Sequence, residues 1–252
     1  MEFSGSVVLV TGGSRGIGSA IARAFAHEGA RVALHYAHSQ RLAEGVLRSL
    51  PGTGHLLFRA DLADRSAPAR LIGDVVAGMG ALNVLVNNAG IFEHHPVLGT
   101  DPERWTEIWD NTLEVNLRAP ALLSFAAARQ MIAQGGGSII NIGSRGAFRG
   151  EPDAPAYGAS KAGLHALGQS LARALAPHRI HVHSIAPGWV ETDMGLPYLQ
   201  GPEGESVRNQ SPLGRLGQPE EIARIALFLA SPRSEYLTGC IIDANGASYL
   251  RS

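Results

Sequence analysis

The chain has 252 residues, 45% of them apolar and 17% charged, with a formal net charge of −1. This composition is typical of a globular protein and excludes a disordered or fibrous chain. The near-neutral charge and the dispersed arginines give no indication of a nucleic-acid partner.

The cysteine count and the hydropathy indicate the compartment. Cys240 is the only cysteine, so no intrachain disulfide can form and a reducing compartment is indicated. The first residues, MEFSGSVVLVTGG, lack the basic region and the apolar length of a signal peptide. No run approaches the ~20 apolar residues of a membrane span. We therefore expect a cytoplasmic protein without a membrane segment.

Short apolar runs alternate with helical patterns along the whole chain. The first strand candidate is SVVLVT. Apolar residues at helical spacing predict helices over 17–29, 40–50, 155–175 and 220–231. The strand candidates are rich in Val, Ile and Leu without strict alternation, as in strands buried on both faces. They cover residues 6–11, 31–36, 55–60, 82–90, 137–144, 180–188 and 239–246. This alternation predicts an α/β fold: one Rossmann domain over 1–252, a doubly wound sheet of seven mostly parallel strands with helices on both faces.

One long stretch, 191–217, shows no clear element and is rich in Gly and Pro. A loop of that length in a compact domain is usually functional, so we expect a substrate loop or lid there.

The first strand ends in the glycine-rich turn TGGSRGIG, residues 11–18. Its glycines are spaced GxxxGxG rather than GxGxxG, the usual dinucleotide fingerprint. Gly12 and Gly16 would let the chain turn sharply near a phosphate, and Gly18 would let the following helix pack closely. That helix would face the pyrophosphate with its positive dipole end. Taken alone, the turn also fits a glycine-rich connection that binds nothing.

Further motifs follow the later strands and carry a resemblance to a known family. They are NNAG at 87–90, Asn116, Ser144, YGASK at 157–161, and Pro187, Gly188 and Thr192. With TGxxxGxG, this set resembles the short-chain dehydrogenase/reductase family over nearly the full chain. The likeness is strongest to 3-oxoacyl-acyl-carrier-protein reductases, through ETDM at 191–194 and the tail PLGRLGQPEEIA. It implies an enzyme that transfers hydride between NAD(P)(H) and a carbonyl or alcohol group.

Tyr157 and Lys161 lie four residues apart, on one face of the predicted helix 155–175. Lys161 is the only lysine of the chain, and an ammonium is a compact charge whereas a guanidinium is a wide fork. We expect Lys161 to lower the pKa of Tyr157, which then serves as the acid near neutral pH. Ser144 would hydrogen-bond the same substrate oxygen. The resemblance implies that Asn116 is catalytic too, holding a water that links Lys161 to solvent; the alternative is a helix-surface amide.

The cofactor prediction depends on the end of the second strand, HYAHSQR, which carries no acid to bind a ribose 2′-hydroxyl. Arg15 would pair with a 2′-phosphate, so we expect NADP(H), with NAD(H) as the alternative. If Arg15 is only a solvated loop arginine, this preference loses its support. Ala37 is the expected residue beside the 2′ position, with Tyr36 as the neighbouring candidate. The resemblance implies a cofactor site made of Gly12, Ser14, Arg15, Gly16, Ile17, Gly18, Tyr36, Ala37, Asp61, Leu62, Asn88, Ala89, Gly90, Tyr157, Lys161, Pro187, Gly188, Val190 and Thr192.

Three functions stay open at this point. The first is an NADPH-dependent carbonyl reductase acting on small ketones, including 3-oxoacyl thioesters. The second is an NAD(P)-dependent dehydrogenase of a sugar or secondary alcohol, and the third is a cofactor-binding regulatory protein without turnover. The complete set of Ser144, Tyr157 and Lys161 argues against the third.

The expected partners also come from the resemblance. It implies a homotetramer, and Arg129 and Arg173 match the arginines that dock an acyl carrier protein. The segment QMIAQGGGS after Arg129 lacks further basic residues, which weakens the case for that acidic partner. His94, His95, His181 and His183 have no supporting cysteine or carboxylate cluster, so we expect no metal site.

Overall fold

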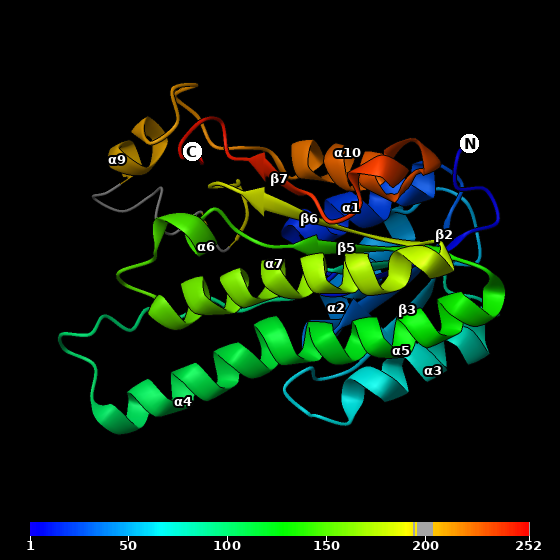
Figure 1. Ribbon diagram of the computed structural model, residues 1–252, viewed down its shortest axis with the longest axis horizontal. Helices are drawn as coiled ribbons and strands as arrows, with labels where there is room; N and C mark the ends of the chain where they lie inside the picture. The colour runs from blue at the N-terminus through cyan, green and yellow to red at the C-terminus, as the bar shows by residue number, and fades with distance from the viewer. Residues whose placement is uncertain (194, 196–203, 252) are drawn as a thin grey trace.

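The computed structural model describes residues 1–193, 195 and 204–251. Within these residues the strands form one sheet of seven in the order β3-β2-β1-β4-β5-β6-β7, and every neighbouring pair is parallel (Figure 1). The strands are β1 (Val7–Val10), β2 (Arg31–Tyr36), β3 (Leu56–Arg59), β4 (Val84–Asn87), β5 (Gly137–Ile142), β6 (Ile180–Pro187) and β7 (Ile241–Ala244). The predicted doubly wound sheet is therefore confirmed, and the strands are all parallel rather than mostly so.

The helices pack on both faces of this sheet. On one face, residues of α1 (Gly16–His27), α2 (Gln40–Ser49) and α10 (Pro219–Ala230) share a core with the strands. On the other face, residues of α3 (Ala67–Met79), α5 (Ala119–Gln134) and α7 (Pro155–Leu175) form a second core. Alternate residues of one strand enter different cores, as Val8 and Leu9 do, which explains the unbroken apolar strand sequences.

A long helical segment runs beside α7. It consists of α4 (Pro102–Leu113), the π-helix η1 (Glu114–Arg118) and α5, which follow one another without a break (Figure 1). Short helices complete the structure: α6 (Gly146–Arg149), η2 (Ala176–His178), α9 (Gly204–Asn209) and η3 (Pro232–Leu237). No helix in the described part of the chain is long and apolar enough to cross a membrane.

β1 and β4 are neighbours at the centre of the sheet. From β1 the chain adds strands toward one edge, and from β4 it adds strands toward the other edge. Ligands of doubly wound sheets bind outside the carboxyl ends of the strands at such a point. The expected lid, 191–217, includes the helix α9, which the sequence did not indicate. Residues 194 and 196–203 of the expected lid lie outside the described residues.

Candidate active site

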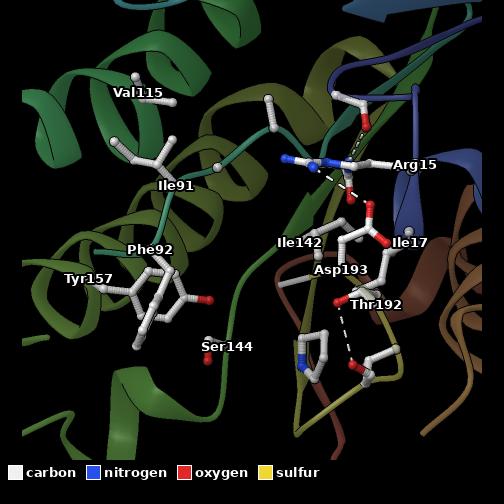
Figure 2. A pocket seen from close by; sticks show the side chains of 18 of the residues that line it. Arg15, Ile17, Ile91, Phe92, Val115, Ile142, Ser144, Tyr157, Thr192 and Asp193 are labelled. Atoms are coloured by element: carbon white, nitrogen blue, oxygen red, sulfur yellow. Dashed lines mark hydrogen bonds and ion pairs between the residues drawn. The ribbon is translucent and has the colours of Figure 1, made fainter. Parts of the chain in front are cut away.

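A cavity of about 500 Å³ opens at the carboxyl ends of the strands (Figure 2). It is lined by Ser144, Tyr157 and Lys161 and by every residue of the expected cofactor site. Those residues come from the β1–α1 turn (Gly12, Ser14, Arg15, Gly16, Ile17, Gly18), from the ends of β2 and β3 (Tyr36, Ala37, Asp61, Leu62), from the end of β4 (Asn88, Ala89, Gly90) and from the end of β6 (Pro187, Gly188, Val190, Thr192). Asn116 is the one predicted site residue that does not line this cavity.

The glycines of the β1–α1 turn have distinct structural roles. Gly12 and Gly16 adopt positive φ angles of 63° and 53°, a left-handed conformation that other residues rarely adopt. A side chain on Gly18 would collide with the Gly12 carbonyl oxygen and the Asn88 amide. The turn therefore exposes backbone to the cavity and lets the N-terminus of α1 come close to it.

Thr11 and Asn88 join the ends of the two central strands. The Thr11 hydroxyl accepts the backbone N–H groups of Asn88 and Ala89 at 2.9 and 3.0 Å and donates to the Val86 carbonyl at 3.1 Å. The Asn88 side chain donates to the Thr11 and Gly12 carbonyl oxygens at 2.8 and 3.2 Å. These bonds fix the position of the glycine turn relative to β4.

His35, at the end of β2, holds the same turn from the other side, and sequence reasoning missed it. Its Nδ1 accepts the Gly12 N–H at 3.1 Å, and its Nε2 lies 3.0 Å from the Ala60 carbonyl oxygen. Only the neutral ring with its proton on Nε2 satisfies both partners. Burial lowers the pKa of His35 to about 4, which keeps this form at neutral pH. A histidine at the end of a buried strand was the one signal available in the sequence.

Helix α7 presents Tyr157 and Lys161 to the cavity, as the four-residue spacing predicted. The Lys161 ammonium donates to the Ile142 carbonyl at 2.9 Å and lies 5.7 Å from the centre of the Tyr157 ring. The Tyr157 hydroxyl faces the Ser144 side chain (Figure 2). Ser144 Oγ accepts the Gly146 N–H at 3.0 Å, so its own proton is directed elsewhere. These three side chains meet at the end of β5, and Tyr157 and Ser144 present hydroxyl groups to one place in the cavity.

The expectation that Lys161 lowers the pKa of Tyr157 is wrong for the protein without ligands. Burial raises the pKa of Tyr157 to about 12, and the neighbouring Ser144 side chain offsets this only in part. The Lys161 ammonium is engaged by a backbone carbonyl, and burial lowers its own pKa to about 8. Desolvation is the largest cause, because partial burial disfavours the charged phenolate. Tyr157 therefore keeps its proton at neutral pH.

Asn116 is fully buried in the π-helix η1, not a surface amide. Its side chain accepts the Ile91 N–H at 2.8 Å and donates to the Ile91 carbonyl at 2.9 Å and to Ser160 Oγ at 3.2 Å. A Cβ on Gly90 would lie 3.3 Å from both Asn116 Oδ1 and Lys161 Nζ. Asn116 thus ties the segment after β4 to α7 directly behind the cavity wall, a common place for a π-helical turn.

The end of the cavity beyond β2 is lined by Tyr36, Ala37, His38 and Ser39, without a carboxylate among them. Arg15 lies opposite, with its side chain 63% exposed and 3.6 Å from the Asp193 carboxylate (Figure 2). Arg59, which sequence reasoning also missed, donates to the Ala37 carbonyl at 3.3 Å. Two arginines therefore lie near this end, one of them already paired with an acid.

The other end of the cavity was not predicted. Ile91, Phe92 and Val115 give it an apolar wall, and the Phe92 ring packs edge-to-face on Tyr157 at 5.0 Å (Figure 2). Arg145 and Glu151 line it as well. An apolar wall beside two hydroxyl groups suits a small molecule with a carbonyl group.

The donor set and the shape fit a dinucleotide. The glycine turn leaves no room for side chains, the N-terminus of a twelve-residue helix faces the cavity, and the volume is of the size that holds small ligands.

Comparison with known proteins agrees with this geometry. Residues 12–246 match the family described as Enoyl-(Acyl carrier protein) reductase. The 3-oxoacyl-[acyl-carrier-protein] reductase FabG of Staphylococcus aureus (strain Mu50 / ATCC 700699) is 38% identical over 96% of this chain and 97% of its own. The L-rhamnose 1-dehydrogenase (NAD(P)(+)) of Sphingomonas sp. (strain SKA58) is 37% identical over 98% and 97%. A short chain dehydrogenase from Burkholderia cenocepacia J2315, solved in complex with NADP, superposes with a TM-score of 0.89 at 36% identity, covering 98% of this chain and 99% of its own.

Proposed function

The chain belongs to the short-chain dehydrogenase/reductase family, and from this premise we propose that it is an NADPH-dependent reductase of ketones. The observation that carries the proposal is the meeting of Tyr157, Ser144 and Lys161 at the edge of a cavity fit for a dinucleotide. The glycine turn, Asp61, the segment after β4 and Thr192 would hold NADP(H). When bound, the nicotinamide would supply the hydride.

The protein's own residues have separate tasks in this reaction. Ser144 and Tyr157 donate hydrogen bonds to the ketone oxygen and so orient and polarise the carbonyl group. As hydride reaches the carbonyl carbon, the Tyr157 hydroxyl proton passes to the oxygen, giving an alcohol and a tyrosinate. The raised pKa of Tyr157 keeps it in the protonated form that reduction requires. Lys161, next to the ring, stabilises the tyrosinate until a solvent proton replaces the one transferred.

The relatives suggest two candidate substrate classes. A 3-oxoacyl reductase and an L-rhamnose dehydrogenase are almost equally similar to this chain, at 38% and 37% identity. We favour a ketone such as a 3-oxoacyl thioester, because the cavity wall next to Tyr157 is apolar. Oxidation of a sugar is the second candidate, supported by the second relative.

The experiment is a turnover assay with both cofactors on acetoacetyl thioester, a panel of simple ketones and a panel of sugars. We expect NADPH consumption with ketones and little oxidation of sugars. Turnover confined to sugar oxidation would replace the first proposal with the second, and no turnover with any substrate would contradict both.

Four accompanying proposals concern the rest of the molecule. The chain acts as one domain, residues 191–217 close over the substrate, and four copies associate through α5 and α7. Docking of an acyl carrier protein would use Arg129 and Arg173, which lie exposed on those two helices. Arg129 stacks over the exposed Phe125 ring at 5.7 Å, so part of its surface is already used within its own helix.

A further inference from the structure

Three N–H donors converge on one neutral oxygen beside the cavity. Arg145 and Trp189 line both this cavity and a smaller neighbouring one, which Gln210 also lines. The Gln210 side-chain oxygen accepts from Arg145 Nη2, from Arg149 Nη1 at 3.1 Å and from Trp189 Nε1 at 3.2 Å. An amide oxygen has two lone pairs, and two of the three donors belong to guanidinium groups. This arrangement of donors suits an anion better than the amide that occupies it.

Arg145 makes no direct ion pair among the described residues, because Glu151, the acid whose charge acts on it, pairs with Arg149. The side chain is only 3% exposed, and no described carboxylate lies within ion-pair distance of it. Its Nη1 has no hydrogen-bond partner within the same part of the chain. Burying an unpaired charge is strongly unfavourable, and buried charges in proteins are normally paired. Burial lowers the pKa of Arg145 to about 10, which still leaves it charged at neutral pH.

The position of this group relates it to the reaction. Arg145 directly follows Ser144, and both line the cavity together with Trp189 and Glu151. The Glu151 carboxylate lies 3.9 Å from Arg149, so one acid faces two guanidinium groups. The net charge of Arg145, Arg149 and Glu151 is therefore +1. It lies next to the place where the carbonyl oxygen would sit.

We propose that Arg145, Arg149 and Trp189 bind a carboxylate of the substrate, and that Gln210 takes its place when the site holds no substrate. The inference rests on the proposed reduction of ketones and, within that class, favours an oxo acid with a free carboxylate over a 3-oxoacyl thioester. The occupant is now a planar amide, which has the size and shape of a carboxylate. A doubly charged phosphate would exceed the single positive charge and would be repelled by Glu151.

The first test compares acids with their primary amides. The probes are 2-oxobutanoate, acetoacetate, 4-oxopentanoate and 5-oxohexanoate, each paired with its neutral, isosteric amide. With NADPH, we expect the wild type to favour at least one acid over its amide by about tenfold in kcat/KM. Arg145→Gln should lower kcat/KM for that acid by about tenfold and change the amide less than about twofold.

Arg208→Gln is the matched control, because it removes one positive charge from the exposed side of the neighbouring helix α9. It should leave both substrates unchanged. Equal losses for acid and amide in Arg145→Gln, or amides preferred at every chain length, would overturn the carboxylate site.

The second test needs no turnover. Gln210→Glu places a carboxylate at the point of convergence, so we expect a higher Tm than the wild type and a raised KM for the oxo acid alone. Gln210→Ala, which removes the amide without adding charge, should not raise the Tm. A Tm of Gln210→Glu below that of Gln210→Ala would refute the anion site even if every ketone is reduced. If no ketone is reduced by the wild type, the proposed function fails, and this comparison still decides the anion site.

Discussion

Lys161 is the single lysine of the chain, and its surroundings in the fold explain why an ammonium is needed there. The side chain is only 4% exposed, enclosed between the Ile142 carbonyl, the Tyr157 ring and Gly90. A guanidinium is wider and would meet these groups before its charge reached the phenol. The residue type at this position is therefore set by size as well as by charge.

Tyr157→Phe removes only the hydroxyl and keeps the ring that packs on Phe92. We expect turnover to fall by about 100-fold or more, because the proton donor is lost. Binding of NADPH, measured by fluorescence titration, should change little. A variant that keeps more than about a tenth of the wild-type rate would show that another group supplies the proton.

We expect the side chains around Ala37 to decide the cofactor preference. The end of β2 lacks an acid and two arginines lie near it, so we expect NADPH to be favoured over NADH by about tenfold in kcat/KM. Arg15→Ala should weaken NADPH binding by about 1.5–3 kcal/mol, because a charged hydrogen bond is lost. The binding of NADH should be nearly unchanged. Ala37→Asp should reverse the preference.

Steady-state kinetics with both cofactors check this prediction. Equal weakening of both in Arg15→Ala would make Arg15 a pyrophosphate or structural residue. Its ion pair with Asp193 is exposed, so breaking that pair should itself have little effect.

At the scale of elements, α7 depends on a cap from a distant loop. The first turn of a helix leaves N–H groups unpaired, and the Ala156 N–H donates to His95 Nε2 at 3.1 Å. His95 Nδ1 lies 2.8 Å from the Glu93 carbonyl oxygen, which fixes the neutral tautomer. His95 is buried and packs edge-to-face on Trp105 at 5.4 Å. Since Tyr157 follows Ala156 directly, this cap also holds the start of the catalytic helix in place.

His95→Ala should lower the free energy of unfolding by about 2 kcal/mol or more, through the lost cap and the lost ring packing. His95→Gln, whose side-chain oxygen can accept the same N–H, should recover part of the loss. Urea unfolding of both variants measures this, with the exposed His94→Gln as the control. Equal stability of His95→Ala and wild type would show that solvent caps the helix equally well.

At the scale of the whole molecule, buried neutral histidines make the fold sensitive to acid. Burial lowers the pKa values of His35, His165 and His183 to about 4 each, from an unfolded value of 6.5. Between pH 6.5 and 4 the unfolded chain therefore binds more protons than the folded one. By linkage, stability is full above the unfolded pKa and falls as the pH drops below it.

We expect the free energy of unfolding to fall by up to about 1.4 kcal/mol per pH unit for each of these histidines. Urea unfolding at several pH values from 7.5 downward measures the slope. His183→Gln should lower the change in unfolding free energy per pH unit by the contribution of one proton. The exposed control variant His178→Gln should leave it unchanged. The carboxylates with lowered pKa, Asp64 and Glu221 at about 2, add to the slope only as the pH approaches their unfolded values of 3.8 and 4.5, so the slope above pH 5 belongs mainly to the histidines. A flat profile down to pH 5 would contradict the prediction.

The outer helices bear on assembly. Phe125 and Ile132 on α5 are 62% and 42% exposed, and α5 runs beside α7 along the same side of the sheet. Exposed apolar side chains on a helix face favour association with another copy. We expect a tetramer, measured as mass by light scattering at micromolar concentration. A monomer mass would refute it.

The sequence by itself determined the order and approximate limits of the seven strands and of the helices α1, α2, α7 and α10. Helix α7 covers Pro155–Leu175, the predicted range, and all seven predicted strands are present. These features depend on neighbours along the chain: apolar periodicity, glycine at turns and proline at helix starts. The glycine spacing at 12, 16 and 18 is local as well, and its φ angles follow from it.

Only the tertiary structure decided which side chains meet and which groups lose water. The bond from Gly12 to His35 spans 23 residues, Ile91 to Asn116 spans 25, and Arg145 to Gln210 spans 65. No periodicity encodes such pairs, since they arise where different strands end at one edge of the sheet. The raised pKa of Tyr157 has the same origin, because desolvation depends on everything packed around the hydroxyl, whereas the sequence shows only a lysine four residues away.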